Sequence, residues 1–165
     1  MGNANVKQKQ DTGGSAKSGG APAKLHPVTG GKGAASPQEI VKSLLDAVVQ
    51  RGDMDFVLSL IDADCAWCGT LAPELAYGGR LHGPVGAGQF FGGMTDTLKI
   101  TRFDMERYVC EGGDVVAMGV WGGIMHKTGK SFETNLALCF RVRGGKIIEF
   151  RGYEDTALTV AALRS

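Results

Sequence analysis

The sequence predicts an α+β domain in which helices precede a curved antiparallel sheet. Between residues 37 and 61 the apolar residues recur at helical spacing, whereas from residue 100 onward they alternate with period two. Turns that contain glycine, near residues 112, 129 and 144, divide the alternating part into four strands of a meander. Helices that bury their apolar side on one face of such a sheet form a two-layer domain.

Charge divides the chain into two parts. Five lysines and one aspartate give residues 1–35 a charge of +4, which leaves −3 for the rest of a 165-residue chain whose net charge is +1. The first part is rich in Gly, Ser and Lys and poor in bulky apolar residues, so we predict a flexible basic arm. Residues 36–165 form the folded domain, and its acidic balance predicts that it does not bind nucleic acid.

The apolar runs are too short to span a bilayer, and the N-terminus lacks the apolar stretch of a signal peptide. We therefore expect a cytoplasmic protein without membrane contact. Cys65 and Cys68 form a C-x-x-C pair, but the second Cys or His pair of a zinc site is missing. Gly69 and Pro73 follow the pair where a redox motif has a helix. We expect structural cysteines, no metal and no cofactor.

The first helix has a complete set of starting signals. Ser36 is a good N-cap, Pro37 suits the first helical position, and Glu39 completes a capping box. Gly52 ends this helix and Asp53 caps a second, shorter one. The apolar face of the first helix comprises Ile40, Val41, Leu44, Leu45 and Val48.

Further elements follow in order along the chain. Residues Cys65–Gly69 read as a short strand, Leu71–Arg80 as an irregular stretch, and Gly83-Pro84 as the start of a helix with Val85, Phe90 and Met94 inward. The expected strands of the meander are Ile100–Cys110, Asp114–His126, Phe132–Val142 and Lys146–Tyr153. A closing helical segment, Thr156–Leu163, has Asp155 as a candidate cap.

Four short strings, in this order, resemble one family. They are Arg51-Gly52-Asp53-Met54-Asp55-Phe56, His82-Gly83-Pro84-Val85, Phe140-Arg141-Val142-Arg143-Gly144-Gly145-Lys146-Ile147 and Tyr153-Glu154-Asp155-Thr156. The pattern is similar to the SnoaL-like, ketosteroid-isomerase-related branch of the NTF2-like superfamily and covers residues 36–165. This resemblance implies a cystatin-like cone, with the N-terminal helices on the concave face of the sheet and a deep pocket between them. It also implies a homodimer formed through the outer face of the sheet.

The resemblance does not extend to the residues of a ketosteroid isomerase. The tyrosine of that mechanism falls at about Leu44 or Leu45, its base at about Trp67, and its second acid near Asn135 or Leu136. We therefore expect no steroid isomerisation by that route. The related cyclases need an acid/base and little else, and for this role the chain offers Asp155, Glu154, Glu133, His126 and His82.

Asp155 and His126 are our candidate catalytic residues. Each also has a structural interpretation, because Asp155 can cap the last helix and His126 can be a surface residue at a turn. Large apolar residues predict the lining of a pocket for a small apolar or aromatic ligand. The predicted ligand-binding residues are Trp67, Phe90, Met94, Met118, Trp121, Leu138, Phe140 and Phe150. These side chains can equally fill a solid core.

Two functions remain open at this point. The first is an isomerase- or cyclase-type enzyme that moves protons on an apolar, enolisable ligand. The second is a ligand-binding or dimeric scaffold module of the same fold without turnover, because one fold hosts many functions. Alternation along the last strand places Ile148, Phe150 and Gly152 toward the pocket and Glu149, Arg151 and Tyr153 on the outer face. Tyr153 is therefore expected outside the site.

Overall fold

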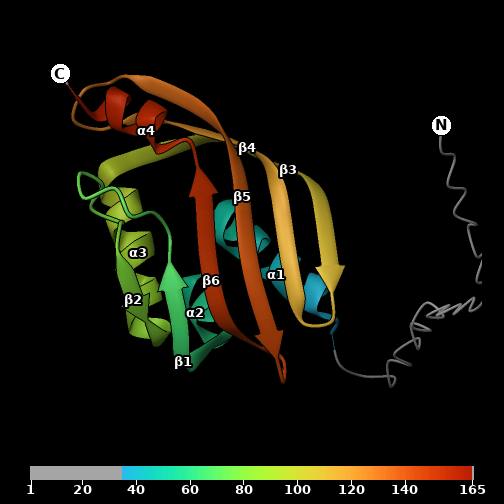
Figure 1. The fold of residues 1–165 in the computed structure, drawn as a ribbon. Helices are drawn as coiled ribbons and strands as arrows, with labels where there is room; N and C mark the ends of the chain where they lie inside the picture. The colour runs from blue at the N-terminus through green and yellow to red at the C-terminus, as the bar shows by residue number, and fades with distance from the viewer. Residues whose placement is uncertain (1–34, 165) are drawn as a thin grey trace, which may run out of the picture. The chain divides into compact units, whose positions relative to one another are not determined.

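The computed structural model describes residues 35–164, which form one two-layer α+β unit (Figure 1). The predicted basic arm lies outside these residues, apart from its last residue. A curved six-stranded sheet has the order β2-β1-β6-β5-β4-β3, and its helices gather on the concave face. The elements are α1 (Pro37–Asp46), η1 (Ala47–Arg51), α2 (Met54–Ser59), β1 (Ile61–Cys68), β2 (Arg80–His82), α3 (Gly83–Thr97), β3 (Leu98–Glu111), β4 (Asp114–Met125), β5 (Ser131–Arg143), β6 (Lys146–Glu154) and α4 (Thr156–Leu163).

The predicted start of the first helix is confirmed atom by atom. The Ser36 hydroxyl accepts a hydrogen bond from the backbone N–H of Glu39, and the Glu39 carboxylate accepts one from the backbone N–H of Ser36. The Ile40, Val41, Leu44 and Leu45 side chains are buried. After Asp46 the helix widens into the π-helix η1, which ends at Gly52 in the left-handed region.

The sheet is mixed, because one pair of its strands is parallel. β1 begins at Ile61, four residues before the predicted strand, and it pairs with β6 in parallel and with β2 antiparallel. β2 lies at the end of the stretch that was predicted to be irregular. The four strands of the predicted meander are present, and each pair of neighbours among them is antiparallel.

Curvature of the sheet comes from irregular pairing between β3 and β4. The register shifts between Ile100 and Arg102 and again between Met105 and Arg107, as happens at β-bulges. A Cβ atom at Gly119 would lie 1.9 Å from the carbonyl oxygen of Asp104, so a side chain does not fit at this bend. The curved strands leave a concave face against which α1 packs on β3, β4 and β5, while α3 packs on β1 and β2.

Two inward predictions are wrong. Val85 is 75% exposed, because the buried face of α3 is formed by Gly86, Ala87, Phe90 and Phe91. In the last strand Ile147, and not Ile148, enters the core, because the register with β5 shifts between Arg141 and Val142. In the part of the chain that the structure describes, no helix is long and apolar enough to cross a membrane.

The shift in β6 gives a direct test of the fold. Ile147 is fully buried whereas Ile148 is partly exposed. We expect Ile147→Ala to lower the free energy of unfolding by about 2–5 kcal/mol, the range for a buried isoleucine, because a cavity remains. The matched variant Ile148→Ala should lose clearly less. Urea denaturation followed by circular dichroism measures both, and an equal loss in the two variants would contradict the register described above.

Candidate ligand-binding and acid/base site

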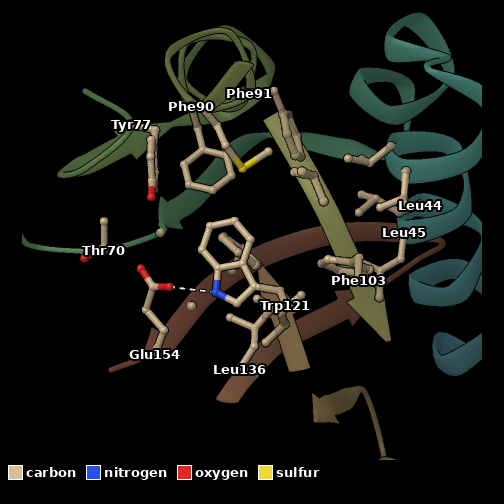
Figure 2. Close-up of a pocket in the computed structure, with 18 of the residues that line it drawn as sticks. Leu44, Leu45, Thr70, Tyr77, Phe90, Phe91, Phe103, Trp121, Leu136 and Glu154 are labelled. Carbon is tan, nitrogen blue, oxygen red and sulfur yellow. Dashed lines mark hydrogen bonds between the residues drawn. The ribbon is translucent and has the colours of Figure 1, made fainter. Parts of the chain in front are cut away.

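An apolar cavity lies between the concave face of the sheet and the helices α1, η1 and α3 (Figure 2). Its volume is about 80 Å³, which is small beside the roughly 300–1,000 Å³ of typical ligand pockets. A ring-sized ligand therefore requires lining side chains to move. The apolar lining residues that are only partly buried mark where the cavity comes nearest to solvent, and they are Val48, Val49, Met94, Ile100 and Phe103.

Seven of the eight predicted ligand-binding residues line this cavity: Trp67, Phe90, Met94, Trp121, Leu138, Phe140 and Phe150. Met118 does not, because it lies on the outer face of β4. Both faces of β4 carry apolar side chains, so its sequence alone does not decide which face turns inward. Pairing with β5 decides it, since Ala117 lies opposite the buried Leu138 and Met118 lies opposite Ala137.

An aromatic cluster forms one wall of the cavity. The ring of Trp67 stacks on Phe150 at a centroid distance of 4.2 Å and meets the edges of Phe90 and Phe91 at 5.8 and 5.5 Å. Contacts between aromatic rings stabilise a core in addition to the stabilisation that comes from removing their apolar surface from water. Leu44, Leu45 and Leu136 also line the cavity. Of the positions matched to the isomerase residues, Leu44, Leu45, Trp67 and Leu136 thus lie at this cavity and carry apolar side chains, whereas Asn135 does not line it.

Polar side chains gather at one end of the cavity, where Figure 2 shows Thr70, Tyr77 and Glu154 facing the same space. Glu154 is the last residue of β6, and Leu136 of β5 lies opposite it. Its side chain points to the concave face, as that of Phe150 does, and Gly152 lies on the same face. Alternation along β6 predicts that positions 150 and 152 face inward, and the next position of the same series is 154.

Both hydrogen bonds that the Glu154 carboxylate receives go to the same oxygen. The indole Nε1 of Trp121 donates to Oε2 at 2.7 Å, and the hydroxyl of Thr159 donates to Oε2 at 3.3 Å. The other oxygen, Oε1, is left free, and in Figure 2 it points toward the Tyr77 hydroxyl. The carboxyl group is therefore held in place by one atom and available for proton transfer at the other.

Burial raises the pKa of the Glu154 carboxyl above its ordinary value, since an apolar surrounding disfavours the charged form. The hydrogen bonds from Trp121 and Thr159 lower this pKa and the nearby charge of Asp155 raises it, but burial is the largest effect. A carboxyl group with a raised pKa exchanges its proton nearer to neutral pH, as an acid/base catalyst must.

The sequence-predicted catalytic residues lie elsewhere. Asp155 caps α4, because its Oδ1 accepts a hydrogen bond from the backbone N–H of Ala157. His126 is exposed, and its Nε2 lies 3.1 Å from the carbonyl oxygen of Thr95 at the end of α3. Neither side chain lines the cavity. Of the other candidates, Glu154 lines the cavity, whereas Glu133 and His82 do not. Glu133 pairs with Arg102, and His82 is an exposed residue before α3.

Tyr77 is the site residue that sequence reasoning missed. It lies between β1 and β2 in a stretch without periodicity, so no pattern in the sequence indicates which way its side chain points. Its hydroxyl and the indole N–H of Trp67 are both buried and have no hydrogen-bond partner. Such unpaired groups are uncommon in native proteins and require an explanation.

The cysteines take no part in this arrangement. Cys65 and Cys68 are free and buried, and burial raises the pKa of Cys65 to about 11, which keeps its thiol protonated and unreactive. Among residues 35–164, no cluster of three or more His, Cys, Asp or Glu side chains is arranged to hold a metal ion.

Comparison with known proteins agrees with the fold. The SnoaL-like domain family matches residues 41–150. The chain therefore belongs to the SnoaL-like domain family, within the NTF2-like superfamily. A search among curated proteins gave no match.

Solved structures show the same fold. An NTF2-like protein from Burkholderia thailandensis is 25% identical, with 79% of this chain and 99% of that chain covered and a TM-score of 0.71. TerC, crystallised with polyporic acid, is 20% identical over 79% and 100% of the two chains, with a TM-score of 0.68. A candidate polyketide cyclase from Xanthomonas campestris is 22% identical over 78% and 96%, with a TM-score of 0.66.

Gly69 controls the free space in the cavity. A Cβ atom at this position would lie 2.1 Å from Cε2 of Phe90, so the ring covers the place where a side chain would be. We expect Gly69→Ala to push the ring of Phe90 into the cavity and to lower stability by about 1–3 kcal/mol, as overpacking does. Binding of an apolar fluorescent dye to the cavity should fall. Dye titration and thermal denaturation measure the two effects, and unchanged dye binding in the folded variant would contradict this geometry.

The raised pKa of Glu154 predicts a pH-dependent stability. Above the carboxyl's unfolded pKa the folded state holds this proton more tightly than the unfolded state, so stability falls as pH rises through the folded pKa. Glu154→Gln removes the titration but keeps an oxygen that can accept from Trp121. We expect the variant to gain stability relative to wild type between pH 5 and pH 8. Urea denaturation at both pH values checks this, and a constant difference would show that the pKa is not raised.

Proposed function

We propose that this protein is an acid/base enzyme that moves a proton on an apolar, enolisable small molecule, with Glu154 as the group that carries the proton. The observation behind this proposal is the free Oε1 of a buried carboxyl at one end of an apolar cavity. A carboxyl group in such a place can both take a proton from carbon and return it, because burial raises its pKa and so brings the protonated form closer in energy to the charged form at neutral pH.

The surroundings of Glu154 suit this reaction. Trp121 and Thr159 fix the carboxylate through Oε2 and leave the direction of Oε1 constant. The apolar lining excludes water, so a bound carbanion or enolate is protected from unwanted protonation. Among the similar structures, TerC was crystallised with polyporic acid and the Xanthomonas campestris protein is a candidate polyketide cyclase. Both descriptions support a small organic ligand for this cavity.

Ligand binding without turnover is the second candidate function. It is favoured by the small volume of the cavity and by the apolar residues at the positions matched to the isomerase. Under this alternative Glu154 is a hydrogen-bonding group for a ligand and never exchanges a proton with carbon. The two functions differ in one measurable quantity, which is the rate of proton exchange on a bound carbon acid.

Deuterium exchange on 1-indanone in D₂O separates these candidates. In the exchange, the carboxylate of Glu154 takes a proton from the carbon beside the carbonyl, the C–H electron pair forms the double bond of the enolate, and a deuteron taken up by the carboxylate is then returned to that carbon. We expect the wild type to accelerate the exchange over buffer, and Glu154→Gln to lower the acceleration by about 10²-fold or more. Mass spectrometry of the recovered ketone gives the rate.

Asp155→Asn is the matched control for this experiment. It removes the neighbouring carboxylate while asparagine still caps α4, so exchange should continue at the wild-type rate. His126→Ala should also keep the rate. Loss of exchange in either control would return the catalytic role to Asp155 or His126, as the sequence alone predicts. If the wild type binds 1-indanone without accelerating exchange, the non-catalytic function is correct.

We also propose that two copies associate through the outer face of the sheet. This face carries the partly exposed Met118, Val120 and Cys139 and the exposed Tyr153. On the same face, Arg141 forms ion pairs with Asp114 and Glu149.

A further inference from the structure

A tied loop holds Tyr77 in place. The two ends of the loop between β1 and β2 are joined by backbone hydrogen bonding. The N–H of Gly79 donates to the carbonyl oxygen of Thr70 at 2.7 Å, and Thr70 and Gly78 form an isolated β-bridge. Within the loop, the N–H of Gly78 donates to the carbonyl oxygen of Leu75. The loop also packs closely on α3, since a Cβ atom at Gly93 would lie 2.9 Å from the carbonyl oxygen of Ala76.

The side chain of Tyr77 is buried to the same degree as the core. It is 3% exposed, and its ring meets the ring of Phe90 edge-on at 5.9 Å. Its hydroxyl reaches the polar end of the cavity, where Figure 2 shows it pointing toward the space beside Glu154. The hydroxyl has no hydrogen-bond partner. Leaving such a group unpaired is unfavourable, whereas a phenylalanine of the same shape carries no such penalty.

We propose that the Tyr77 hydroxyl donates a hydrogen bond to the carbonyl oxygen of the ligand, which makes ring ketones with a hydrogen on the neighbouring carbon the substrate class. The donor and the Glu154 carboxyl face the same end of the cavity, so a ketone placed there presents its oxygen to Tyr77 and its neighbouring C–H bond to Oε1. The hydrogen bond strengthens as the oxygen gains charge, and the enolate is stabilised relative to the ketone.

The ionisation of Tyr77 agrees with the role of a donor. Burial, and next the charge of Glu154, raise the pKa of the phenol far above its ordinary value, so the proton stays on its oxygen. When Glu154 removes the proton from carbon, the C–H electron pair forms the carbon–carbon double bond and the carbonyl π electrons move to oxygen. Tyr77 keeps its proton throughout and acts as a donor, not as an acid.

The role of Tyr77 in turnover rests on the proposed function, but its role in binding does not. The two are tested separately with 1-indanone and indane, which share one ring skeleton and differ by the carbonyl oxygen. Tyr77→Phe removes only the hydroxyl. Tyr153→Phe is the matched control, because Tyr153 is 53% exposed on the outer face of the sheet.

We expect Tyr77→Phe to be at least as resistant to heat as the wild type, because its hydroxyl has no bond to lose. Its preference for 1-indanone over indane, measured by isothermal titration calorimetry, should fall about tenfold, the typical effect of one hydrogen bond. Its affinity for indane should not change. In Tyr153→Phe the heat resistance, the affinities for both ligands and the rate of exchange should stay at their wild-type values. Exchange on 1-indanone should fall by about 10²–10³-fold. The carbonyl stretch of bound 1-indanone should lie at lower frequency in the wild type than in Tyr77→Phe.

Three results would overturn the inference. An unchanged preference for the ketone in Tyr77→Phe excludes the hydrogen bond to oxygen. A lower melting temperature with equal loss of both ligands shows a structural role. An unshifted carbonyl stretch in the wild type shows that the ketone oxygen meets no donor. If exchange is absent in the wild type but the preference is lost in Tyr77→Phe, the proposed function fails while the hydroxyl's role in ligand recognition stands.

Discussion

The hydrogen bond from the indole of Trp121 to the carboxylate of Glu154 is the interaction on which the candidate site of this domain depends. A carboxyl group in an apolar cavity is unfavourable without a partner, and Trp121 supplies that partner at 2.7 Å across β5. Trp121 and Thr159 both donate to one carboxylate oxygen. The carboxyl group therefore has hydrogen-bond partners and still keeps its second oxygen free. The cavity therefore contains a carboxyl group that is fixed in place and has one oxygen without a partner.

Curvature of the sheet brings the two residues of that hydrogen bond closer together. Trp121 stands on β4 and Glu154 on β6, and β5 lies between these strands. On a flat sheet, side chains of strands so separated point in parallel and do not meet unless they are long. The bulges in β3 and the absence of a side chain at Gly119 bend β4 toward the helices. The same bend makes room for the aromatic cluster around Trp67 below the helices.

Much of this fold could be predicted from local patterns. The capping box at Ser36, the strands of the meander and the glycine turns all result from interactions between residues close in the chain, which sequence displays directly. Pairings between distant segments are not displayed in this way. The parallel pairing of β1 with β6 joins residues more than eighty positions apart in the chain, and the short strand β2 pairs with residues about fifteen positions away. Local patterns therefore predict neither pairing.

The site was predictable to a similar degree. The large apolar residues that line the cavity lie on strands and helices with regular periods, and only Met118 was placed on the wrong face, because β4 is apolar on both. Glu154 follows from the alternation of Phe150 and Gly152, but its position beside Asp155 at the end of the strand hides it. Tyr77 has no such signal, since its direction is set by the packing of an irregular loop on α3.

Glu154 and Tyr77 belong to parts of the chain that can change independently. Glu154 is the last residue of a strand in the sheet, whereas Tyr77 stands on a short loop that is closed by its own backbone bonds between Thr70 and Gly79. A change confined to that loop alters Tyr77 while Glu154 stays on its strand. Over evolutionary time, such a division would allow new side chains to enter one end of the cavity while the buried carboxyl is retained.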